Sequence, residues 1–220
     1  MKRILFCLMT IIVVFCLSVP AKAFPLLELR GTDTLGNRLI YDPDFDITWY
    51  DFSNVFDTWD NQVTWAGALS VDFGGSIFDD WRLPTALNQD GSGPDGPGFN
   101  VTGSEMGHLF YTELGNKGYY ATDGTFPQPG WGLTNTGDFQ NLVASVYWSG
   151  TEYSADTGYA WYFIFNGGGQ GTVSKTTSHY GLAVRSGDVA AVPEPATVAL
   201  LGIGLAGMAI YGLRRRRQRR

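Results

Sequence analysis

Three carboxylates stand at alternating positions early in the sequence, where they could bind a hard cation. They are Asp42, Asp44 and Asp46. Calcium takes several oxygen ligands at once, so such a group has the right chemistry for it. However, no glycine turn with a closing glutamate follows at the spacing of a calcium loop. We therefore interpret these residues as solvated acids of a turn.

A second group of oxygen ligands lies in the segment 88–98, which is rich in Gly, Pro, Asp and Asn. Its composition predicts a loop, and its length is typical of a binding loop. Asn88, Asp90 and Asp95 are the candidate ligands, with calcium as the candidate cofactor. A mobile polar insertion without a ligand is the alternative interpretation of the same loop.

The sequence contains two histidines, His108 and His179. Either could assist Asp/Glu pairs in a hydrolase or a modifying enzyme. They are far apart in the sequence, and neither a G-x-S-x-G nor an H-E-x-x-H motif is present. We therefore expect a protein without catalytic residues, and we expect His108 to be a structural residue, exposed or half-buried on a helix.

Two helices are predicted to position these groups. The spacing of Trp65, Ala66 and Leu69 indicates a first helix within 59–71, stopped by Gly74 and Gly75. A second helix is predicted after Thr102-Gly-Ser-Glu105, which has the pattern of a capping box. Its apolar face would carry Met106, Leu109, Phe110 and Leu114, and Gly115 would end it.

Strands are predicted in both halves of the chain. Ile47–Tyr50 is β-branched and aromatic, and residues 159–165 alternate with the period of a strand. Residues 146–152 begin the last third, the glycines of 166–171 suit a hairpin turn, and the alternation of 180–184 favours a closing strand. The pattern as a whole predicts an α+β domain with antiparallel sheets.

Aromatic residues are frequent in the glycine-rich segment 117–142, which lacks regular periodicity. Two interpretations remain open. The rings either fill the core beneath loops, or they form a platform on which the C–H face of a sugar ring can pack. The residues concerned are Tyr119, Tyr120, Phe126, Trp131 and Phe139.

The first residues have the organisation of a secretory signal peptide. Lys2 and Arg3 precede an apolar run, and Ala21-Lys22-Ala23 is an A-x-A cleavage site. We expect signal peptidase to remove 1–23. The two cysteines, Cys7 and Cys16, lie in that segment, so disulfides, thiol nucleophiles and Cys-ligated zinc are excluded from the mature domain.

The charge of the chain is distributed unevenly. Between Phe24 and Pro195, six basic residues stand against all 21 acidic ones, which gives a formal charge of −15 where the whole chain has −6. Such a surface repels nucleic acid and anionic polymers and favours bound cations. We expect no nucleic-acid partner.

The length suits an entry segment over 24–45 and one domain over 46–189.

The C-terminal residues combine three physically different pieces: a linker at 190–195 with Pro193-Glu194-Pro195, an uncharged stretch at 196–213, and an arginine-rich tail at 214–220. The stretch is near the lower limit for a transmembrane helix. Arginines are held on the cytoplasmic side, so the domain is expected across the membrane. The basic residues next to the helix are Arg214, Arg215, Arg216 and Arg217.

This order of pieces resembles the PEP-CTERM sorting signal of Gram-negative bacteria, which an exosortase recognises in the inner membrane. The resemblance implies cleavage near Pro193-Glu194-Pro195 and release of the domain to the envelope, the cell surface or the exterior, often where exopolysaccharide is made. A plain single-pass anchor is the alternative. Exosortase, signal peptidase and, transiently, the inner membrane are the expected partners.

The domain resembles the Lcl C-terminal-like domain, also called the Fibrobacter major paralogous domain, which has the C-type-lectin-like fold. The resemblance implies two short helices, twisted antiparallel sheets and a loop-built binding edge that takes polysaccharide or envelope material. It also implies mainly structural roles for the motif residues, with Arg82 and Glu105 paired. These motifs are Trp81-Arg82-Leu83-Pro84-Thr85, Glu105 with Leu109, Tyr147-Trp148-Ser149-Gly150-Thr151-Glu152, Trp161 with Phe163, and Arg185.

Three functions follow as expectations from the sequence. The leading one is a non-enzymatic surface or matrix protein that binds polysaccharide. A self-assembling structural component of the envelope is the second, and a hydrolase that depends on carboxylates and histidine is the third. The Glu-Pro-Asn and Trp-Asn-Asp triplets of calcium-dependent lectins are absent, so a sugar site of that type is not implied.

Overall fold

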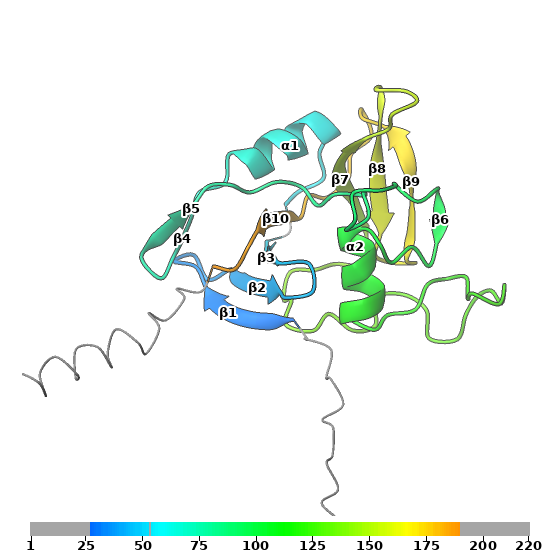
Figure 1. Ribbon diagram of the computed structural model, residues 1–220, viewed down its shortest axis with the longest axis horizontal. Coiled ribbons are helices and arrows are strands. Elements are labelled where there is room, and N and C mark those ends of the chain that lie inside the picture. The colour runs from blue at the N-terminus through cyan, green and yellow to red at the C-terminus, as the bar shows by residue number, and fades with distance from the viewer. Residues whose placement is uncertain (1–26, 53, 190–220) are drawn as a thin grey trace, which may run out of the picture.

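A computed structural model describes residues 27–52 and 54–189 of the protein. Within these residues two four-stranded antiparallel sheets, a short hairpin and two helices form an α+β fold (Figure 1). The expected α+β class and the antiparallel pairing are therefore present. The expected signal peptide, the PEP linker at 190–195 and the apolar stretch 196–213 lie outside the described residues.

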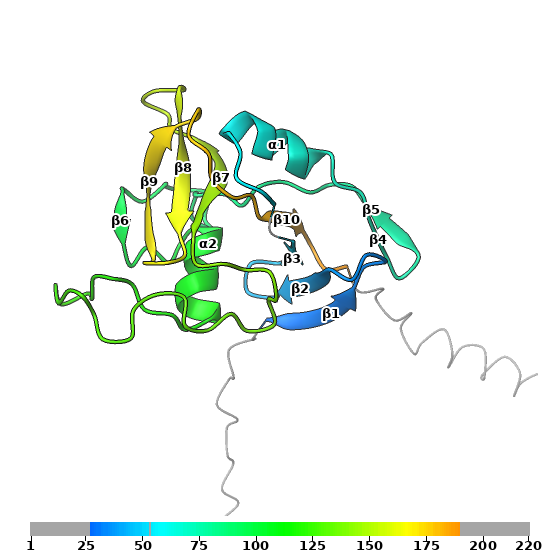
Figure 2. The same ribbon diagram turned by 180° about the vertical axis from the view of Figure 1, so that it is seen from behind.

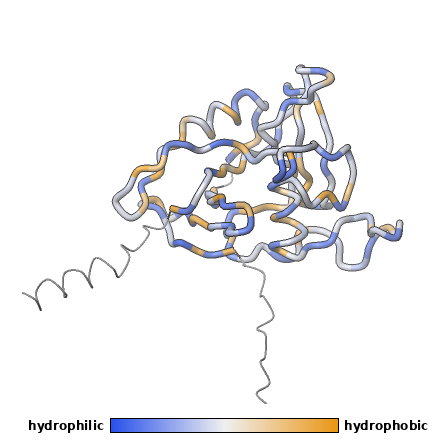
Figure 3. Tube along the Cα trace, in the orientation of Figure 1, coloured by the Kyte–Doolittle hydropathy of each residue, from blue (hydrophilic) through white to orange (hydrophobic). Residues whose placement is uncertain are grey.

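The described part of the chain contains no helix long and apolar enough to cross a membrane. Along its trace, hydrophobic and hydrophilic residues replace each other after short stretches (Figure 3).

The first sheet has the order β1 (Glu28–Thr32), β2 (Arg38–Asp42), β3 (Ile47–Asp51) and β10 (Ala183–Ser186). All five residues of β3 are buried, as suits a central strand. The domain boundary expected at residue 46 falls inside this sheet, because the segment 24–45 supplies two of its strands. A register shift between Leu29 and Gly31 interrupts the two-residue alternation of β1. The sequence pattern therefore does not predict this strand.

The second sheet has the order β6 (Gly98–Phe99), β9 (Gly169–Ser174), β8 (Tyr159–Ile164) and β7 (Val146–Glu152). Ile164 lies opposite Gly169, so the glycine-rich segment makes the β8–β9 turn. The strand expected at 159–165 and the hairpin turn in the glycines that follow are confirmed, whereas the strand at 146–152 was not predicted.

The first helix, α1 (Trp59–Gly67), is shorter than expected. Residues 71–73 instead form β4 (Val71–Phe73), which pairs with β5 (Ser76–Phe78). Gly74 and Gly75 have φ of 61° and 82°, which lets them form the tight turn of this hairpin. The glycine pair therefore joins two strands and does not end the helix.

The second helix, α2 (Glu105–His108), continues as a π-helical turn, η1 (Leu109–Glu113). Its N-cap is Ser104, whose hydroxyl accepts from the Gly107 N–H at 3.3 Å. The expected capping box on Thr102 is therefore wrong. Glu105 cannot reach back to cap the helix because Arg82 holds its carboxylate. The expected stop is present, since Gly115 has φ of 62°.

The main core joins both four-stranded sheets to α2. Trp49 of β3, Phe110 of η1 and Phe163 of β8 are among its fully buried side chains. In the two opposite views, α2 lies between the β1–β2–β3–β10 sheet and the β6–β9–β8–β7 sheet (Figures 1 and 2). The three tryptophans expected in the core are buried, with exposed fractions of 3%, 0% and 4% for Trp81, Trp148 and Trp161.

Candidate functional site

Arg82 and Glu105 form a bidentate ion pair. The Arg82 Nη1 and Nη2 atoms lie 2.8 and 2.7 Å from Glu105 Oε2 and Oε1. The Thr85 N–H also donates to Glu105, at 2.7 Å. The Glu105 side chain is 7% exposed, and its hydrogen bond raises the pKa of the Arg82 guanidinium. The pair therefore fastens segment 81–85 to the start of α2.

The other residues of the motifs mostly bond to each other. Thr151 Oγ1 contacts Thr85 Oγ1 at 3.0 Å and accepts from the Ala86 N–H at 2.9 Å. The Gly150 N–H donates to the Pro84 carbonyl at 2.8 Å. Glu152 pairs with Lys175, and Arg185 pairs with Asp80. Leu83, Leu109, Tyr147, Ser149 and Phe163 are buried. Such contacts suit a scaffold.

The 88–98 loop brings its three candidate calcium ligands together only in part. The Asn88 side-chain amide donates to Asp95 Oδ1 at 3.1 Å, so a nitrogen of Asn88 faces this carboxylate. Asp90 Oδ1 accepts from the Ser92 N–H at 2.9 Å within its own turn, and Asp90 and Asp95 are exposed. Calcium at this loop stays a prediction.

The early carboxylates differ from the expected solvated acids. Asp42, the last residue of β2, is fully buried, because the β2–β3 turn folds back over it. Its Oδ1 atom accepts from the N–H groups of Asp44 and Phe45 at 3.1 and 3.2 Å. The Asp44 side chain is 25% exposed, and Asp46 is exposed and accepts from the Tyr41 hydroxyl. Only Asp46 fits the expectation.

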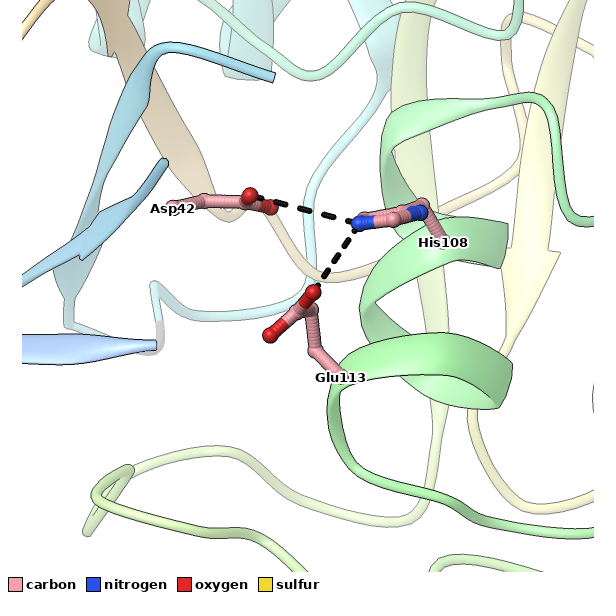
Figure 4. Close-up of side chains that lie close together, drawn as sticks. All are labelled: Asp42, His108 and Glu113. Atoms are coloured by element: carbon pink, nitrogen blue, oxygen red, sulfur yellow. Dashed lines mark hydrogen bonds and ion pairs between the residues drawn. The ribbon is translucent and has the colours of Figure 1, made fainter. Parts of the chain in front are cut away.

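His108 lies at the centre of a carboxylate cluster, where the expectation was an exposed or half-buried residue. Its Nε2 atom is 3.1 Å from Glu113 Oε1, 3.7 Å from Asp44 Oδ2 and 4.0 Å from Asp42 Oδ1. Figure 4 shows the Asp42 and Glu113 carboxylates facing the same edge of the imidazole ring. The Phe45 ring stacks on His108, with 4.0 Å between the ring centroids.

The π-helical turn explains why the sequence does not reveal this cluster. In an α-helix, residues five apart point about 140° away from each other, since each residue turns the helix by about 100°. The Leu114 N–H bonds to the Leu109 carbonyl, five residues back, at 2.9 Å. This wider turn allows His108 and Glu113 to meet. No helical periodicity in the sequence pairs a histidine with a glutamate at that spacing.

Burial and mutual repulsion control the protonation of the cluster. Burial raises the pKa of Glu113 to about 7, and the charges of Asp42 and Asp44 add to this effect. Burial also raises the pKa of Asp42 and lowers that of His108. Removing these groups from water disfavours the charged form of each.

A set of aromatic rings forms a second candidate site on the segment 117–132. Tyr120, Phe126 and Trp131 are 38%, 60% and 42% exposed, whereas Phe139 is buried in the core. The rings contact each other with centroid separations of 4.9 Å for Tyr119–Trp131, 4.9 Å for Tyr120–Phe126 and 4.8 Å for Tyr120–Phe99. Of the two open interpretations, core filling holds for Phe139 only.

Backbone hydrogen bonds hold this aromatic loop in place. The Tyr119 N–H donates to Gly167 at 2.8 Å, and the Gly132 N–H donates to Lys117 at 2.9 Å. The Gln128 side chain donates to the Gly118 carbonyl at 2.9 Å. In Figure 1 the segment extends beyond the sheets at the lower right. The rings are therefore presented on a braced loop that projects from the domain.

The other histidine, His179, occupies an apolar environment. Its ring packs against Trp148, with 4.6 Å between the centroids, and against Tyr162. Burial lowers its pKa. Its backbone pairs with Asp57, which lies just before α1. The role that these contacts support is packing.

The described residues thus define a small α+β domain with an exposed aromatic loop. The chain also contains a sorting signal after this domain. Residues 191–217 match the family model of the PEP-CTERM protein-sorting motif. PEP-CTERM proteins are processed by exosortase, and the motif implies passage through the membrane to an extracellular or cell-surface location. Comparisons with curated proteins and with solved structures found no match to this chain.

Proposed function

We propose that the protein is a non-enzymatic surface or matrix protein that exosortase sorts and that binds polysaccharide through the loop 117–132. The exposed rings of Tyr120, Phe126 and Trp131 carry this proposal. The order of motifs that resembles the Lcl C-terminal-like domain supports it, because that resemblance implies a C-type-lectin-like fold with a binding edge made of loops.

The chemistry of the loop favours a neutral polysaccharide. Aromatic rings bury a large apolar area on contact, and the C–H face of a sugar ring offers a matching surface. The formal charge of −15 between Phe24 and Pro195 opposes an anionic polymer. Neutral glycans of the envelope or of exopolysaccharide are therefore the proposed ligand class.

Replacing Trp131 with alanine is expected to weaken binding to neutral glycan at least fivefold. The indole is 42% exposed and packs edge-on against Tyr119, so its loss removes a stacking face. Truncating an aromatic anchor costs more than about 1 kcal/mol, which corresponds to a factor of about five. Retention of the exported protein on a glycan array and on the producing organism's own exopolysaccharide measures the effect.

Phe56→Ala is the matched control for this variant. Phe56 is 51% exposed and packs on Tyr180, away from the 117–132 loop. It should leave binding unchanged. Equal losses for Trp131→Ala and Phe56→Ala, or a wild-type protein that no glycan retains, would remove the loop from the proposal.

Processing by exosortase predicts that the two ends of the chain have different fates. An epitope inserted after Phe24 is expected to stay on the mature protein, while an epitope after Arg220 is lost with the cleaved tail. Immunoblots of cell and medium fractions with both antibodies provide the measurement. Both epitopes on one membrane-bound species would show that the tail is a permanent anchor.

A further inference from the structure

We propose that Asp42, His108 and Glu113 form a binding site for a divalent transition-metal ion. Asp44 lies next to these three ligands, with its Oδ2 atom 3.7 Å from His108 Nε2. The bound ion joins the end of β2 to the π-helical turn after α2, and so fastens the second helix to the first sheet. This site is separate from the aromatic loop, and its function does not depend on glycan binding.

The spacing of the ligand atoms fits a single ion. Zinc binds histidine nitrogen and carboxylate oxygen at about 2.0–2.2 Å, so two atoms on one ion are at most about 4.4 Å apart. The three carboxylates lie 3.1, 3.7 and 4.0 Å from His108 Nε2. In the group of Asp42, His108 and Glu113, one ligand atom from each lies within 4.8 Å of the others. A small inward shift completes the set.

A buried oxygen of Asp42 that lacks a hydrogen-bond partner among the described residues supports a cation site. The Asp42 side chain is 0% exposed, and its Oδ2 atom has no hydrogen-bond partner among the described residues. Its carboxylate faces the cluster in Figure 4. The Trp49 N–H lies near this carboxylate but outside hydrogen-bond geometry, and it too is unpaired among the described residues. Buried polar atoms are seldom left in this state.

The charge of the cluster supports the same conclusion. Among the described residues, the ion pairs of Asp42, Asp44 and Glu113 are with His108 alone. Three carboxylates share one imidazole here, and the side chains of Asp42 and Glu113 are 0% and 2% exposed. Burial of unpaired charge is strongly unfavourable, and a divalent cation would compensate for it.

Outer contacts already orient the ligands. The Leu27 N–H donates to Glu113 Oε2 at 3.2 Å, which leaves Oε1 directed at His108. The Phe45 ring stacks on the imidazole, and two backbone N–H groups hold Asp42 Oδ1. Metal sites depend on such supporting contacts for ligand orientation. The arrangement is therefore a built site.

The donor atoms decide the class of metal. Calcium and magnesium prefer all-oxygen sites, whereas imidazole nitrogen suits zinc and the neighbouring transition metals. One nitrogen with two or three carboxylate oxygens fits Zn²⁺ or Mn²⁺. Since His108, Asp42 and Glu113 are nearly closed to solvent, the structural role is favoured over a catalytic one, which needs an open coordination position.

The test uses the full chain, purified in detergent without a histidine tag and depleted of metal with a chelator. Calorimetric titration with Zn²⁺, Mn²⁺, Ca²⁺ and Mg²⁺ should show one site per chain for Zn²⁺ or Mn²⁺, with weak or no binding of the other two. At a hundredfold excess over Kd, the metal should raise the midpoint of thermal unfolding by about 5–10 °C. Co²⁺ should give visible absorption bands in the unmodified protein.

Glu113→Gln and His108→Gln are expected to weaken Zn²⁺ binding at least tenfold and to abolish the thermal shift. His179→Gln is the matched control and should bind as the wild type does, because His179 packs among aromatic rings. The Co²⁺ absorption bands are measured on the unmodified protein. They therefore test the site even if a variant does not fold.

Three results would overturn the proposal: no binding of Zn²⁺ or Mn²⁺ by the unmodified chain at millimolar concentration, a preference for Ca²⁺ over both, or an equal loss of binding in His179→Gln.

Discussion

Replacing Pro193, Glu194 and Pro195 with alanines is expected to trap the protein in the inner membrane and to reduce its release at least tenfold. The matched sorting motif spans 191–217, so the substitution removes the part that resembles the processing signal and keeps the apolar stretch. Two prolines also keep the chain extended before this stretch, whereas alanines would let a helix continue upstream. Fractionation of cells followed by immunoblotting measures the change.

Thr197→Ala serves as the control for this experiment. It alters the same segment but leaves the Pro-Glu-Pro triplet and the arginines intact, and release should be unchanged. Mass spectrometry of the released species should locate a cleavage near the triplet in both the wild type and the control. Normal release of the triple-alanine variant would show that another feature directs processing.

Glu105→Gln is expected to destabilise the domain by about 2–4 kcal/mol, since it leaves the Arg82 guanidinium without its buried counter-charge. Breaking a buried ion pair typically costs about 3–5 kcal/mol. The Arg82 side chain is 40% exposed, which lets water replace part of the interaction and reduces the loss. The midpoint of thermal unfolding should fall by about 5–12 °C. Near-ultraviolet circular dichroism of the buried tryptophans measures this midpoint.

Asp80→Asn is the matched control, because it breaks another bidentate pair in a different environment. The two Asp80 oxygens accept from Arg185 at 2.7 and 3.0 Å, but the Asp80 side chain is 52% exposed. Exposed pairs contribute about 0–1 kcal/mol. Equal destabilisation by Asp80→Asn and Glu105→Gln would show that burial does not determine the strength of the Arg82–Glu105 pair.

Local sequence signals predicted strands β3 and β8 and the turn after β8, but they did not predict how the strands of the first sheet pair. Residues 159–164 alternate in type, and the glycines of 166–171 suit the turn that follows, so neighbouring residues carry the information. In the first sheet, β3 pairs with β10, and Thr48 lies opposite Arg185. A pairing between such distant segments leaves no local pattern.

The N-cap of the second helix and the burial of Asp42 could not be predicted from the sequence for a different reason. Thr102 and Ser104 both suit an N-cap, and the choice between them depends on Arg82, which holds Glu105 from outside the helix. Similarly, the neighbours of Asp42 in the sequence are typical of a solvated turn. Asp42 becomes buried only because the β2–β3 turn packs against α2. Capping and burial are decided here by partners far away in the sequence.

The sequence by itself determined the match to a PEP-CTERM sorting motif, the acidic charge between Phe24 and Pro195 and the α+β class. These properties follow from composition and local order, since hydropathy and charge act additively along the chain. Only the tertiary structure decided which acids are buried around His108 and which rings are exposed beside Trp131. Both depend on long-range packing, in which distant segments exclude water from one group and leave another in contact with it.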